Sequence, residues 1–279
     1  MSKKKIIAIT GSSGYLGKKI TNLLKKKYKL LIFTTKKKND TKSIVYKKYC
    51  LGENYEYIFS LKNIEGIVHI ATNYGRKNQK SKNIYLANYD IPNKIFEAFI
   101  KSDIQYFINT DTFYTLKNNK NLKDYILSKK KFFLKINKRY EKKIINLKLF
   151  HVIGKNDNKD KFIPKTISML NKNKKIVLKF PKNEVDFIHV DDVVEAYINI
   201  INHIDIYKNK FYNFSIASGK TYSIFKLVKS LKKNLKSRSK IICLNQFKKK
   251  IFKSNKKNLI KNIWKPKYSF NQIINKVTY

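Results

Sequence analysis

Residues 5–17 of the chain read Lys5-Ile6-Ile7-Ala8-Ile9-Thr10-Gly11-Ser12-Ser13-Gly14-Tyr15-Leu16-Gly17. An apolar run precedes the glycines, and Ile20, Leu23 and Leu24 follow at helical spacing, which predicts strand, turn and helix. In Gly11-x-x-Gly14-x-x-Gly17, the first glycine permits a tight turn and the second lets the backbone approach a pyrophosphate. The third lets helix and strand pack closely, and the helix N-terminus offers free N–H groups to phosphate.

A plain structural turn and a P-loop are the alternatives for this segment. A P-loop requires Ser or Thr after its Lys to bind Mg²⁺, whereas this chain has Gly17-Lys18-Lys19 and a misplaced first glycine. The position between a strand and a helix favours dinucleotide binding over a plain turn.

Strands and helices alternate along the first half of the chain. Strands are expected at 30–33, 43–46, 66–71, 105–110 and 144–150, with helices at 83–101 and 124–140. This alternation predicts an α/β fold, a Rossmann-type doubly wound parallel sheet with right-handed crossovers. Residues 1–153 are expected to form an NAD(P)-binding Rossmann domain, completed by a returning segment near 186–203. Residues 154–279 would form mainly a smaller C-terminal substrate-binding lobe.

The composition is strongly basic. The 279 residues include 63 Lys and Arg against 18 Asp and Glu, a formal net charge of +45. Arginine, which nucleic-acid binders use for forked contacts, occurs only as Arg76, Arg139 and Arg238. The lysines are spread along the chain, and the other abundant residue types share A/T-rich codons, so nucleic acid is not expected as a partner. The charge does predict attraction for anionic small molecules.

Membrane and metal partners are not expected either. No run of about 18 apolar residues exists, and no signal-peptide pattern precedes the first strand. Cys50 and Cys243 form neither a disulfide framework nor a metal knuckle, which favours a reducing, cytoplasmic setting.

Tyr125 and Lys129 form a candidate acid/base pair on one helix face. A free phenol has a pKa of about 10, and an ammonium about 4 Å away contributes up to roughly 4 kcal/mol, or about three pKa units. We therefore expect Lys129 to lower the pKa of Tyr125. Chance predicts about four Tyr/Lys pairs at this spacing, and the chain has three, so position must decide. Tyr125 follows a strand that ends in the hydroxyl cluster Thr110-Asp111-Thr112.

Taken together, the chain resembles the extended short-chain dehydrogenase/reductases, the NAD-dependent epimerase/dehydratase family. Within it, the chain is most similar to sugar-nucleotide 4-ketoreductases of the CDP-abequose and CDP-paratose synthase type. The matching segments are Gly11–Gly17, His69-Ile70-Ala71, Asn88, Thr110 with Tyr125 and Lys129, 149–154, 161–164, 186–193 and 263–266.

The resemblance implies roles for individual residues. Tyr125 would be the acid/base, Lys129 would bind the nicotinamide ribose, and Thr110 would orient the substrate oxygen. The implied cofactor contacts are Gly11, Ser13, Gly14, Tyr15, Leu16, Gly17, Thr34, Lys36, Ala71, Thr72, Asn88, Lys129, Phe150 and Val152. The implied substrate contacts are Asp111, Thr112, His151, Lys161 and Phe162, although His151 is equally well explained as a packed histidine.

The cofactor preference follows from the end of the second strand. An NAD-preferring site carries Asp or Glu there to bind the ribose 2′-hydroxyl, whereas this chain has Phe33-Thr34-Thr35-Lys36-Lys37-Lys38 and no acid before Asp40. Hydroxyl and ammonium groups suit a 2′-phosphate, so NADP(H) is favoured over NAD(H).

A 4-keto reduction of a nucleotide-linked deoxyhexose, as in polysaccharide biosynthesis, is the expected reaction. A 4,6-dehydratase of this family carries Thr-Asp-Glu where this chain has Thr112 in place of Glu, and a 4-epimerase typically shows the missing acid. The epimerase remains the second candidate and the dehydratase the third. Outside enzymes, a non-catalytic dinucleotide-binding or basic binding module is open. The base, the sugar and the oligomeric state stay open, with a homodimer as the candidate assembly.

Overall fold

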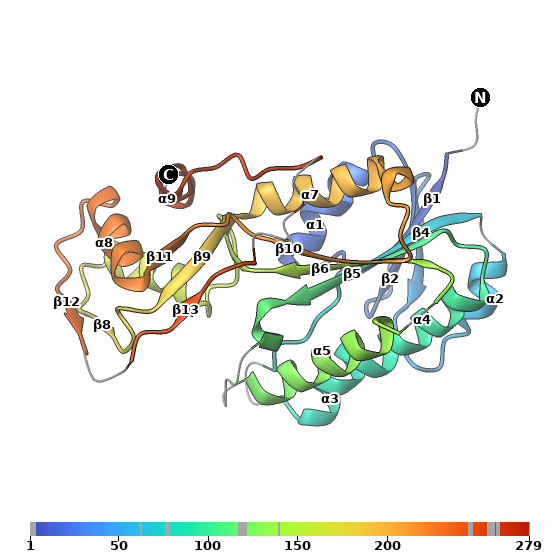
Figure 1. The fold of residues 1–279 in the computed structure, drawn as a ribbon, viewed down its shortest axis with the longest axis horizontal. Coiled ribbons are helices and arrows are strands. Elements are labelled where there is room, and N and C mark those ends of the chain that lie inside the picture. Colours follow the sequence, from blue (N-terminus) through green and yellow to red (C-terminus); the bar gives the residue numbers. More distant parts are fainter. Residues whose placement is uncertain are drawn as a thin grey trace. The chain divides into compact units, whose positions relative to one another are not determined.

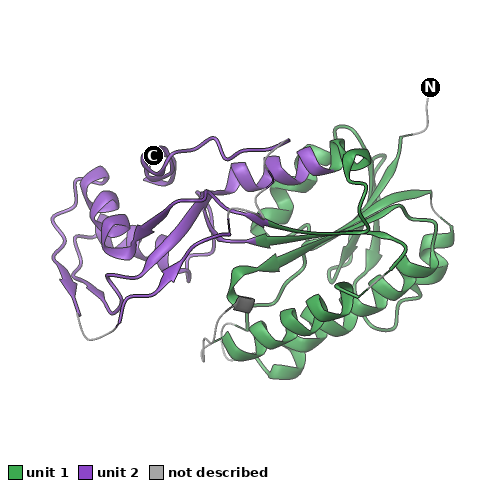
Figure 2. Ribbon diagram, viewed as in Figure 1, with its two compact units in different colours: residues 1–148, 201–214 green, residues 149–200, 215–279 purple. Residues whose placement is uncertain are grey.

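The computed structural model describes residues 4–61, 63–75, 79–116, 122–138, 140–244, 248–255, 260 and 263–278. The chain forms two compact units, unit 1 with residues 1–148 and 201–214 and unit 2 with residues 149–200 and 215–279 (Figure 2). This division differs from the predicted boundary at 153 and the predicted return near 186–203. The strand within 186–203 pairs with strands of unit 2, and the segment that returns to unit 1 is 201–214.

The central sheet lies mainly in unit 1 and confirms the predicted fold class. Its order is β10-β6-β5-β4-β1-β2-β3, and the printed pairs of β1 with β2 and β4, β2 with β3, and β4 with β5 are parallel. The strands are β1 (Ile6–Thr10), β2 (Lys29–Thr34), β3 (Ile44–Lys48), β4 (Ile64–His69), β5 (Tyr106–Thr112), β6 (Lys143–Leu149) and β10 (Phe211–Ile216). Each expected strand of the first half is therefore present.

Helices cover both faces of this sheet. Helix α1 (Tyr15–Leu24) lies on one face, and α4 (Ile91–Lys101) and α5 (Lys123–Ile136) lie on the other, next to α2 (Tyr55–Ser60) (Figure 1). Phe96, Phe99, Phe107 and Phe132 pack there with ring centroids 5.3–6.3 Å apart. Burial of these apolar side chains supplies the main stabilisation of the layer.

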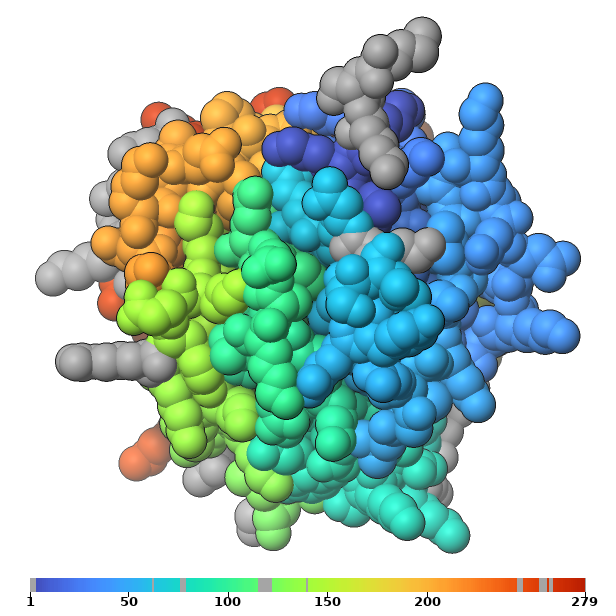
Figure 3. All heavy atoms as spheres, turned by 90° about the vertical axis from the view of Figure 1, so that its right-hand side faces the viewer, coloured from blue at the N-terminus to red at the C-terminus, as the bar shows by residue number. Residues whose placement is uncertain are grey.

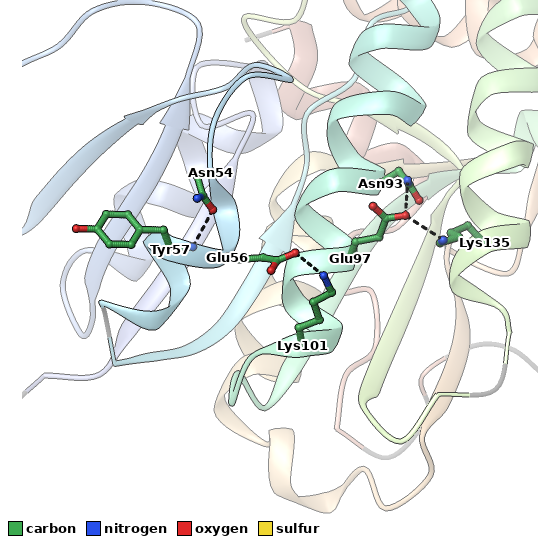
Figure 4. Close-up of polar contacts among 7 residues, drawn as sticks. All are labelled: Asn54, Glu56, Tyr57, Asn93, Glu97, Lys101 and Lys135. Atoms are coloured by element: carbon green, nitrogen blue, oxygen red, sulfur yellow. Dashed lines mark hydrogen bonds and ion pairs between the residues drawn. The ribbon is translucent and has the colours of Figure 1, made fainter.

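The outer rim of these helices carries polar contacts. Lys101 of α4 reaches Glu56 of α2 at 2.7 Å, and Lys135 of α5 reaches Glu97 of α4 at 3.2 Å (Figure 4). Solvent-exposed ion pairs contribute little to stability, so we attribute the packing of these helices mainly to their buried apolar side chains. The side of the molecule that faces the viewer in Figure 3 is formed largely by segments of the N-terminal half.

The helix before the fifth strand contains an irregular turn. Helix α3 (Ser81–Tyr85) runs into a π-helical turn, Leu86–Asp90, and then into α4. Pro92 lies at the start of α4 and has no N–H to donate to the carbonyl of Asn88, four residues earlier, which favours the wider turn. Asn88 lies at the centre of this turn.

Unit 2 has its own sheet and core. Strand β9 (Glu184–His189) pairs with β7 (His151–Ile153), β11 (Thr221–Ser223) and β13 (Ile251–Phe252), and β8 (Ile176–Leu178) pairs with β12 (Ile241–Cys243). The helices are α6 (Phe162–Asn171), α7 (Val190–Asn202), α8 (Ile224–Asn234) and α9 (Phe270–Thr278). Asp192, in the first turn of α7, accepts the backbone N–H groups of Lys267 and Tyr268. None of the helices in the described residues is long and apolar enough to span a membrane.

We expect Gly11→Ala to destabilise the protein. Gly11 has φ +76°, and a Cβ there would lie 2.4 Å from the backbone nitrogen of Ala71. The left-handed conformation and the clash together should lower the free energy of unfolding by about 2–4 kcal/mol. Gly52→Ala is the matched control, because nothing lies within 4 Å of its added Cβ. Chemical denaturation of both variants measures the difference, and equal stabilities would contradict the close approach.

Candidate active site

The glycine turn has the features of an anion site. The Gly14 N–H donates to the Gly11 carbonyl at 3.1 Å, and a Cβ on Gly17 would lie 2.0 Å from that same carbonyl oxygen. Gly14 is the N-cap of α1 with no side-chain cap bond, and no acid occupies the first turn. Ser13 and Gly14 are exposed. The first N–H groups of α1 are therefore available to a phosphate, as a dinucleotide requires.

The ends of β1 and β4 meet directly beside this turn. The Thr10 hydroxyl oxygen accepts the backbone N–H groups of Ile70 at 3.2 Å and Ala71 at 3.3 Å. The same hydroxyl lies 2.7 Å from Nδ1 of His69, whose pKa is lowered well below its usual value by burial and by Lys129. His69 is therefore neutral, and its ring fixes the Thr10 hydroxyl that binds the Ile70 and Ala71 N–H groups.

The end of β2 contains no carboxylate that could bind a ribose. The Thr34 hydroxyl accepts the backbone N–H of Lys36 at 3.2 Å, and the side chain of Lys36 is exposed. Asp40, the first acid after this strand, accepts the backbone N–H of Tyr46 at 2.7 Å. The Asp40 carboxylate thus binds the backbone of β3. This arrangement is consistent with the predicted preference for a 2′-phosphate.

Asn88 is fully buried, and its amide is fully used. Its Oδ1 accepts the backbone N–H of Asn73 at 2.7 Å and the Thr72 hydroxyl at 3.3 Å. Its Nδ2 donates to the Asn73 carbonyl at 2.8 Å and to the Ser128 hydroxyl at 3.1 Å. An amide has two donors and two acceptor positions, so none remains for a ligand. We therefore revise the expected direct cofactor contact: Asn88 fixes the segment after β4 against α5.

Tyr125 and Lys129 lie on the buried face of α5, as predicted, and each is 3% exposed. The pKa of Tyr125 is raised well above its usual value, mainly by burial and then by Tyr74, while a hydrogen bond with the Thr112 side chain acts in the opposite direction. The expectation of a lowered pKa is thus wrong for this structure. Burial penalises the phenolate more than the surrounding groups stabilise it.

Lys129 contacts the fifth strand. Its ammonium donates to the Thr110 carbonyl at 2.5 Å. Burial lowers the pKa of Lys129 to about 8, and the nearby Asp111 carboxylate opposes that shift. The Lys129 ammonium therefore loses its proton more readily than an exposed lysine does. A backbone carbonyl at the carboxyl end of β5 holds it in position.

The hydroxyl that meets Tyr125 belongs to Thr112. Thr112 hydrogen-bonds the phenol, and its Oγ1 also accepts the Tyr114 N–H at 3.3 Å. Thr110, predicted to orient the reacting oxygen, is partly buried and contributes its backbone carbonyl to Lys129. Both threonines thus lie at the Tyr125–Lys129 pair, one through its side chain and the other through its backbone.

Asp111 points into the protein, because successive strand residues face opposite sides of a sheet. Its Oδ2 lies 3.7 Å from Nζ of Lys148 and 3.4 Å from Nδ2 of Asn146. Asn146 also accepts from Asn109 at 2.6 Å and donates to Asn213 at 2.9 Å. The Asp111 side chain is 1% exposed. In this structure Asp111 belongs to a buried polar network, and its contact with the substrate stays a prediction.

The remaining predicted residues lie in unit 2. Phe150 is buried, and its N–H donates to the Ile216 carbonyl at 3.2 Å. His151 and Val152 pair with Phe187 and Ile188 in the β7–β9 ladder. Lys161 binds the Asp157 carboxylate at 2.8 Å, directly before Phe162, which begins α6 and is 47% exposed. Exposed Phe162 is free of the core and stays a predicted substrate contact.

A hollow of about 660 Å³ lies elsewhere in unit 1. It is lined by Glu56, Tyr57, Lys101 and Ile104, among others, near the Glu56–Lys101 ion pair drawn in Figure 4. Its lining includes Ile64 at the amino end of β4, whereas parallel α/β sheets bind ligands at the carboxyl ends of their strands. None of the predicted site residues lines it. Among the described residues, no group of three His, Cys, Asp or Glu side chains is arranged to hold a metal.

Sequence reasoning missed Tyr74 and Tyr114. The ring of Tyr74 lies 4.9 Å from that of Tyr125 at an angle of 34°, and both missed tyrosines pack against the small cluster of Ile84, Tyr125 and Ile126. Tyr74 follows the carboxyl end of β4 and Tyr114 that of β5. That position, where ligands of parallel sheets bind, is the signal that identifies them.

Comparison with known proteins gives matches along most of the chain. The model of the NAD dependent epimerase/dehydratase family matches residues 7–215. The CDP-abequose synthase of Salmonella typhimurium is 33% identical over 213 residues, covering 72% of this chain and 71% of the relative. That of Salmonella muenchen is 29% identical over 246 residues, covering 85% and 83%.

Solved structures resemble the fold. The UDP-N-acetylglucosamine 4-epimerase of Methanobrevibacter ruminantium has a TM-score of 0.80 at 20% identity, covering all of this chain and 98% of that one. The UDP-glucose 4-epimerase of Thermotoga maritima has a TM-score of 0.78 at 18% identity, covering 98% and 97%. At these identities the likeness extends to the fold alone.

Lys129→Met should change how stability depends on pH. A lysine with a folded pKa of about 8 binds fewer protons than in the unfolded chain, where its pKa is about 10.5. Its burial penalty is full below pH 8 and fades as pH rises to 10.5. The free energy of unfolding of the wild type relative to Lys129→Met should therefore rise by about 3 kcal/mol across that window. Denaturant melts of the exposed-site control Lys130→Met should run parallel to the wild type, and a flat difference for Lys129→Met contradicts the buried ammonium.

Proposed function

The chain belongs to the NAD-dependent epimerase/dehydratase family, and from that premise we propose that it reduces the 4-keto group of a nucleotide-linked deoxyhexose. The observation that carries the proposal is the buried Tyr125 phenol, hydrogen-bonded to Thr112 one helical turn before Lys129. A ketone reduction needs a proton donor at the developing alkoxide, and this phenol keeps its proton at neutral pH.

The protonated phenol favours reduction over epimerisation as the first step. An epimerase begins by removing the proton of the sugar hydroxyl, which requires a phenolate, whereas burial disfavours that form here. A reductase begins with the proton on the enzyme. The protonated phenol is compatible with the reductase, which is also the kind of enzyme that the sequence motifs favour, and the epimerase stays the second candidate.

Each group of the site has a task in this reaction. A nicotinamide cofactor bound at the glycine turn would supply a hydride for the carbonyl carbon. Tyr125 donates its proton to the carbonyl oxygen, and the Thr112 hydroxyl orients the phenol. Lys129 would bond the cofactor ribose and would stabilise the phenolate that remains, and the Thr110 carbonyl holds the Lys129 ammonium in place. Solvent returns one proton, so that ketone, reduced cofactor and proton give alcohol and oxidised cofactor.

The substrate is proposed to be linked to cytidine diphosphate. Two relatives of this chain, 33% and 29% identical, bear the name CDP-abequose synthase. Lys161 and Phe162 of unit 2 are the candidate contacts for the nucleotide sugar, with His151 alongside them in sequence.

NADPH is the proposed reductant. The glycine turn offers the open N-terminus of α1 to the pyrophosphate, together with Ala71 and Thr72 across the β1–β4 junction. The hydroxyl of Thr34 and the exposed ammonium of Lys36 are the proposed partners of the 2′-phosphate. An exposed ammonium adds only modest affinity, so the protein should bind NADPH only a few fold more tightly than NADH.

Tyr125→Phe should abolish most turnover. Offered NADPH and a CDP-linked 4-keto-deoxyhexose, the wild type should oxidise NADPH, and the variant should lose about 10²- to 10⁴-fold in kcat. NADPH binding, followed by intrinsic fluorescence, should be unchanged. Tyr222→Phe is the control, because Tyr222 and Lys226 have the same spacing in unit 2 and Tyr222 stacks on Phe270 at 4.0 Å. Parental turnover in Tyr125→Phe would falsify the assignment.

Lys36→Ala should weaken NADPH binding about two- to fivefold and leave NADH binding unchanged, because only NADPH carries the 2′-phosphate. Fluorescence titration of both cofactors measures the ratio. Lys26→Ala removes one exposed charge elsewhere and corrects for the overall positive field. Equal losses for the two cofactors would place the 2′-phosphate away from Lys36.

A further inference from the structure

One end of unit 2 is built from sequence without acidic residues. It includes α6, β8, α8 and β12, and the labels of β8, α8 and β12 lie together at that end in Figure 1. These elements come from residues 161–183 and 206–279, and neither stretch contains Asp or Glu. Asp160 and Glu184 flank the first stretch, and Asp205 is the last acid of the sequence. The lysines are spread along the whole chain, but the acids are not, so positive charge on these elements is not neutralised from within them.

Two lysine-rich turns lie side by side at this end of unit 2. The first, 172–175, follows α6, and the second, 232–240, includes the last residues of α8 and leads to β12. The backbone N–H of Arg238 donates to Oδ1 of Asn173 at 2.8 Å, and the Ser237 hydroxyl donates to the same oxygen at 3.1 Å. The two turns are therefore held against each other by hydrogen bonds of the protein itself.

Six exposed side chains of these turns form a group of positive charges, which we call the basic patch. They are Lys172, Lys174, Lys175, Lys233, Lys236 and Arg238. A positive charge in the last turn of a helix is favourable, which accounts for Lys233 in α8. This effect falls off beyond the last turn, so it gives no reason for the charges that follow α6 and α8. Like charges on adjoining turns repel one another, and a negatively charged partner would relieve that repulsion.

We infer that the basic patch binds the surface of an anionic lipid bilayer. Clusters of roughly four to eight Lys and Arg bind anionic headgroups through charge. The turns 172–175 and 232–240 contain no aromatic residue on which a nucleobase could stack, and Arg238 is their single forked side chain for base edges. Their one large apolar residue, Leu235, packs against the core of unit 2, so a protein partner would meet little apolar surface.

Binding of this kind is peripheral and needs no membrane span. None of the described helices is long and apolar enough to cross a membrane, and lysine side chains can reach headgroups from outside the bilayer. The lack of a spanning segment in the sequence therefore does not bear on the basic patch. The inference is also independent of the proposed reaction, because it uses none of the candidate site residues.

Co-sedimentation of the full chain with vesicles tests the inference. Vesicles of phosphatidylcholine mixed with phosphatidylglycerol present an anionic surface, and vesicles of phosphatidylcholine alone present a neutral one. At about 0.15 M salt the protein should sediment with the anionic vesicles and not with the neutral ones, and about 1 M salt should release it. No binding to the anionic vesicles at about 0.15 M salt overturns the inference.

A variant of the basic patch measures its share of this binding. Replacing four of its charges by glutamine should weaken binding to the anionic vesicles about 10²-fold. The four substitutions are Lys172→Gln, Lys174→Gln, Lys233→Gln and Arg238→Gln. Replacing the same three lysines by arginine keeps the charge and should keep the affinity. Loss of binding in the arginine variant overturns the inference, because it would show that charge does not decide the contact.

A matched control separates the basic patch from the overall charge of the chain. It removes four exposed lysines of unit 1, at the end of α1 and the start of β2, and should weaken binding less than about threefold. The four substitutions are Lys25→Gln, Lys26→Gln, Lys27→Gln and Lys29→Gln. Both fourfold glutamine variants should keep the wild-type midpoint of thermal unfolding, because the replaced side chains are exposed. Equal losses of vesicle binding in the two variants overturn the inference.

A double-stranded oligonucleotide, titrated into the same proteins, tests the other polyanion that could occupy the basic patch. Its affinity should fall equally in the patch variant and in the unit 1 control, because it would follow the total charge alone. If the patch substitutions weaken oligonucleotide binding more than vesicle binding, the patch is a nucleic-acid surface and the assignment to lipid is wrong.

Discussion

The close approach of β1 and β4 at the glycine turn is the constraint on which the rest of the site depends. Gly11 can touch the Ala71 backbone because it has no Cβ, and the Thr10 hydroxyl binds the two N–H groups beside that contact. This junction leaves the N-terminus of α1 open. It also fixes where the chain leaves β4, and hence where Tyr74 meets Tyr125.

The chemistry of the site is set by burial more than by charge, despite a net charge of +45. Burial raises the pKa of Tyr125 and lowers that of Lys129 to about 8. Both groups are thereby moved toward their neutral forms, which a low-dielectric environment favours. Because the pKa of Lys129 is about 8, this side chain still carries its proton near neutral pH and can stabilise the phenolate that remains when Tyr125 gives up its proton. The family's chemistry is compatible with that arrangement.

Much of the fold could be predicted because apolar periodicity reports the sheet directly. The strand, glycine turn and helix of residues 6–24 are local in sequence, and so is the spacing of Tyr125 and Lys129. The burial of Asp111 could also have been predicted, because successive residues of β5 face opposite sides of the sheet and Asp111 therefore faces away from the side of Thr110 and Thr112. The direction of the Tyr125 pKa shift could not have been predicted, because Tyr74 comes from a loop 51 positions away in the sequence. Only the pairing of β4 with β5 brings that loop close to Tyr125. The predicted cofactor contact of Asn88 failed for a similar reason. Its partners are distant in sequence, and together they occupy every hydrogen-bonding position of its side-chain amide.

The side-chain amide of Asn88 connects the loop of Tyr74 to the helix of Tyr125, because it bonds Asn73 in the loop and Ser128 on the helix. Aspartate at this position has no donors for Asn73 and Ser128, and glutamine is one methylene too long for the same bonds. A substitution that moves this loop should therefore also displace Tyr125, the proposed proton donor.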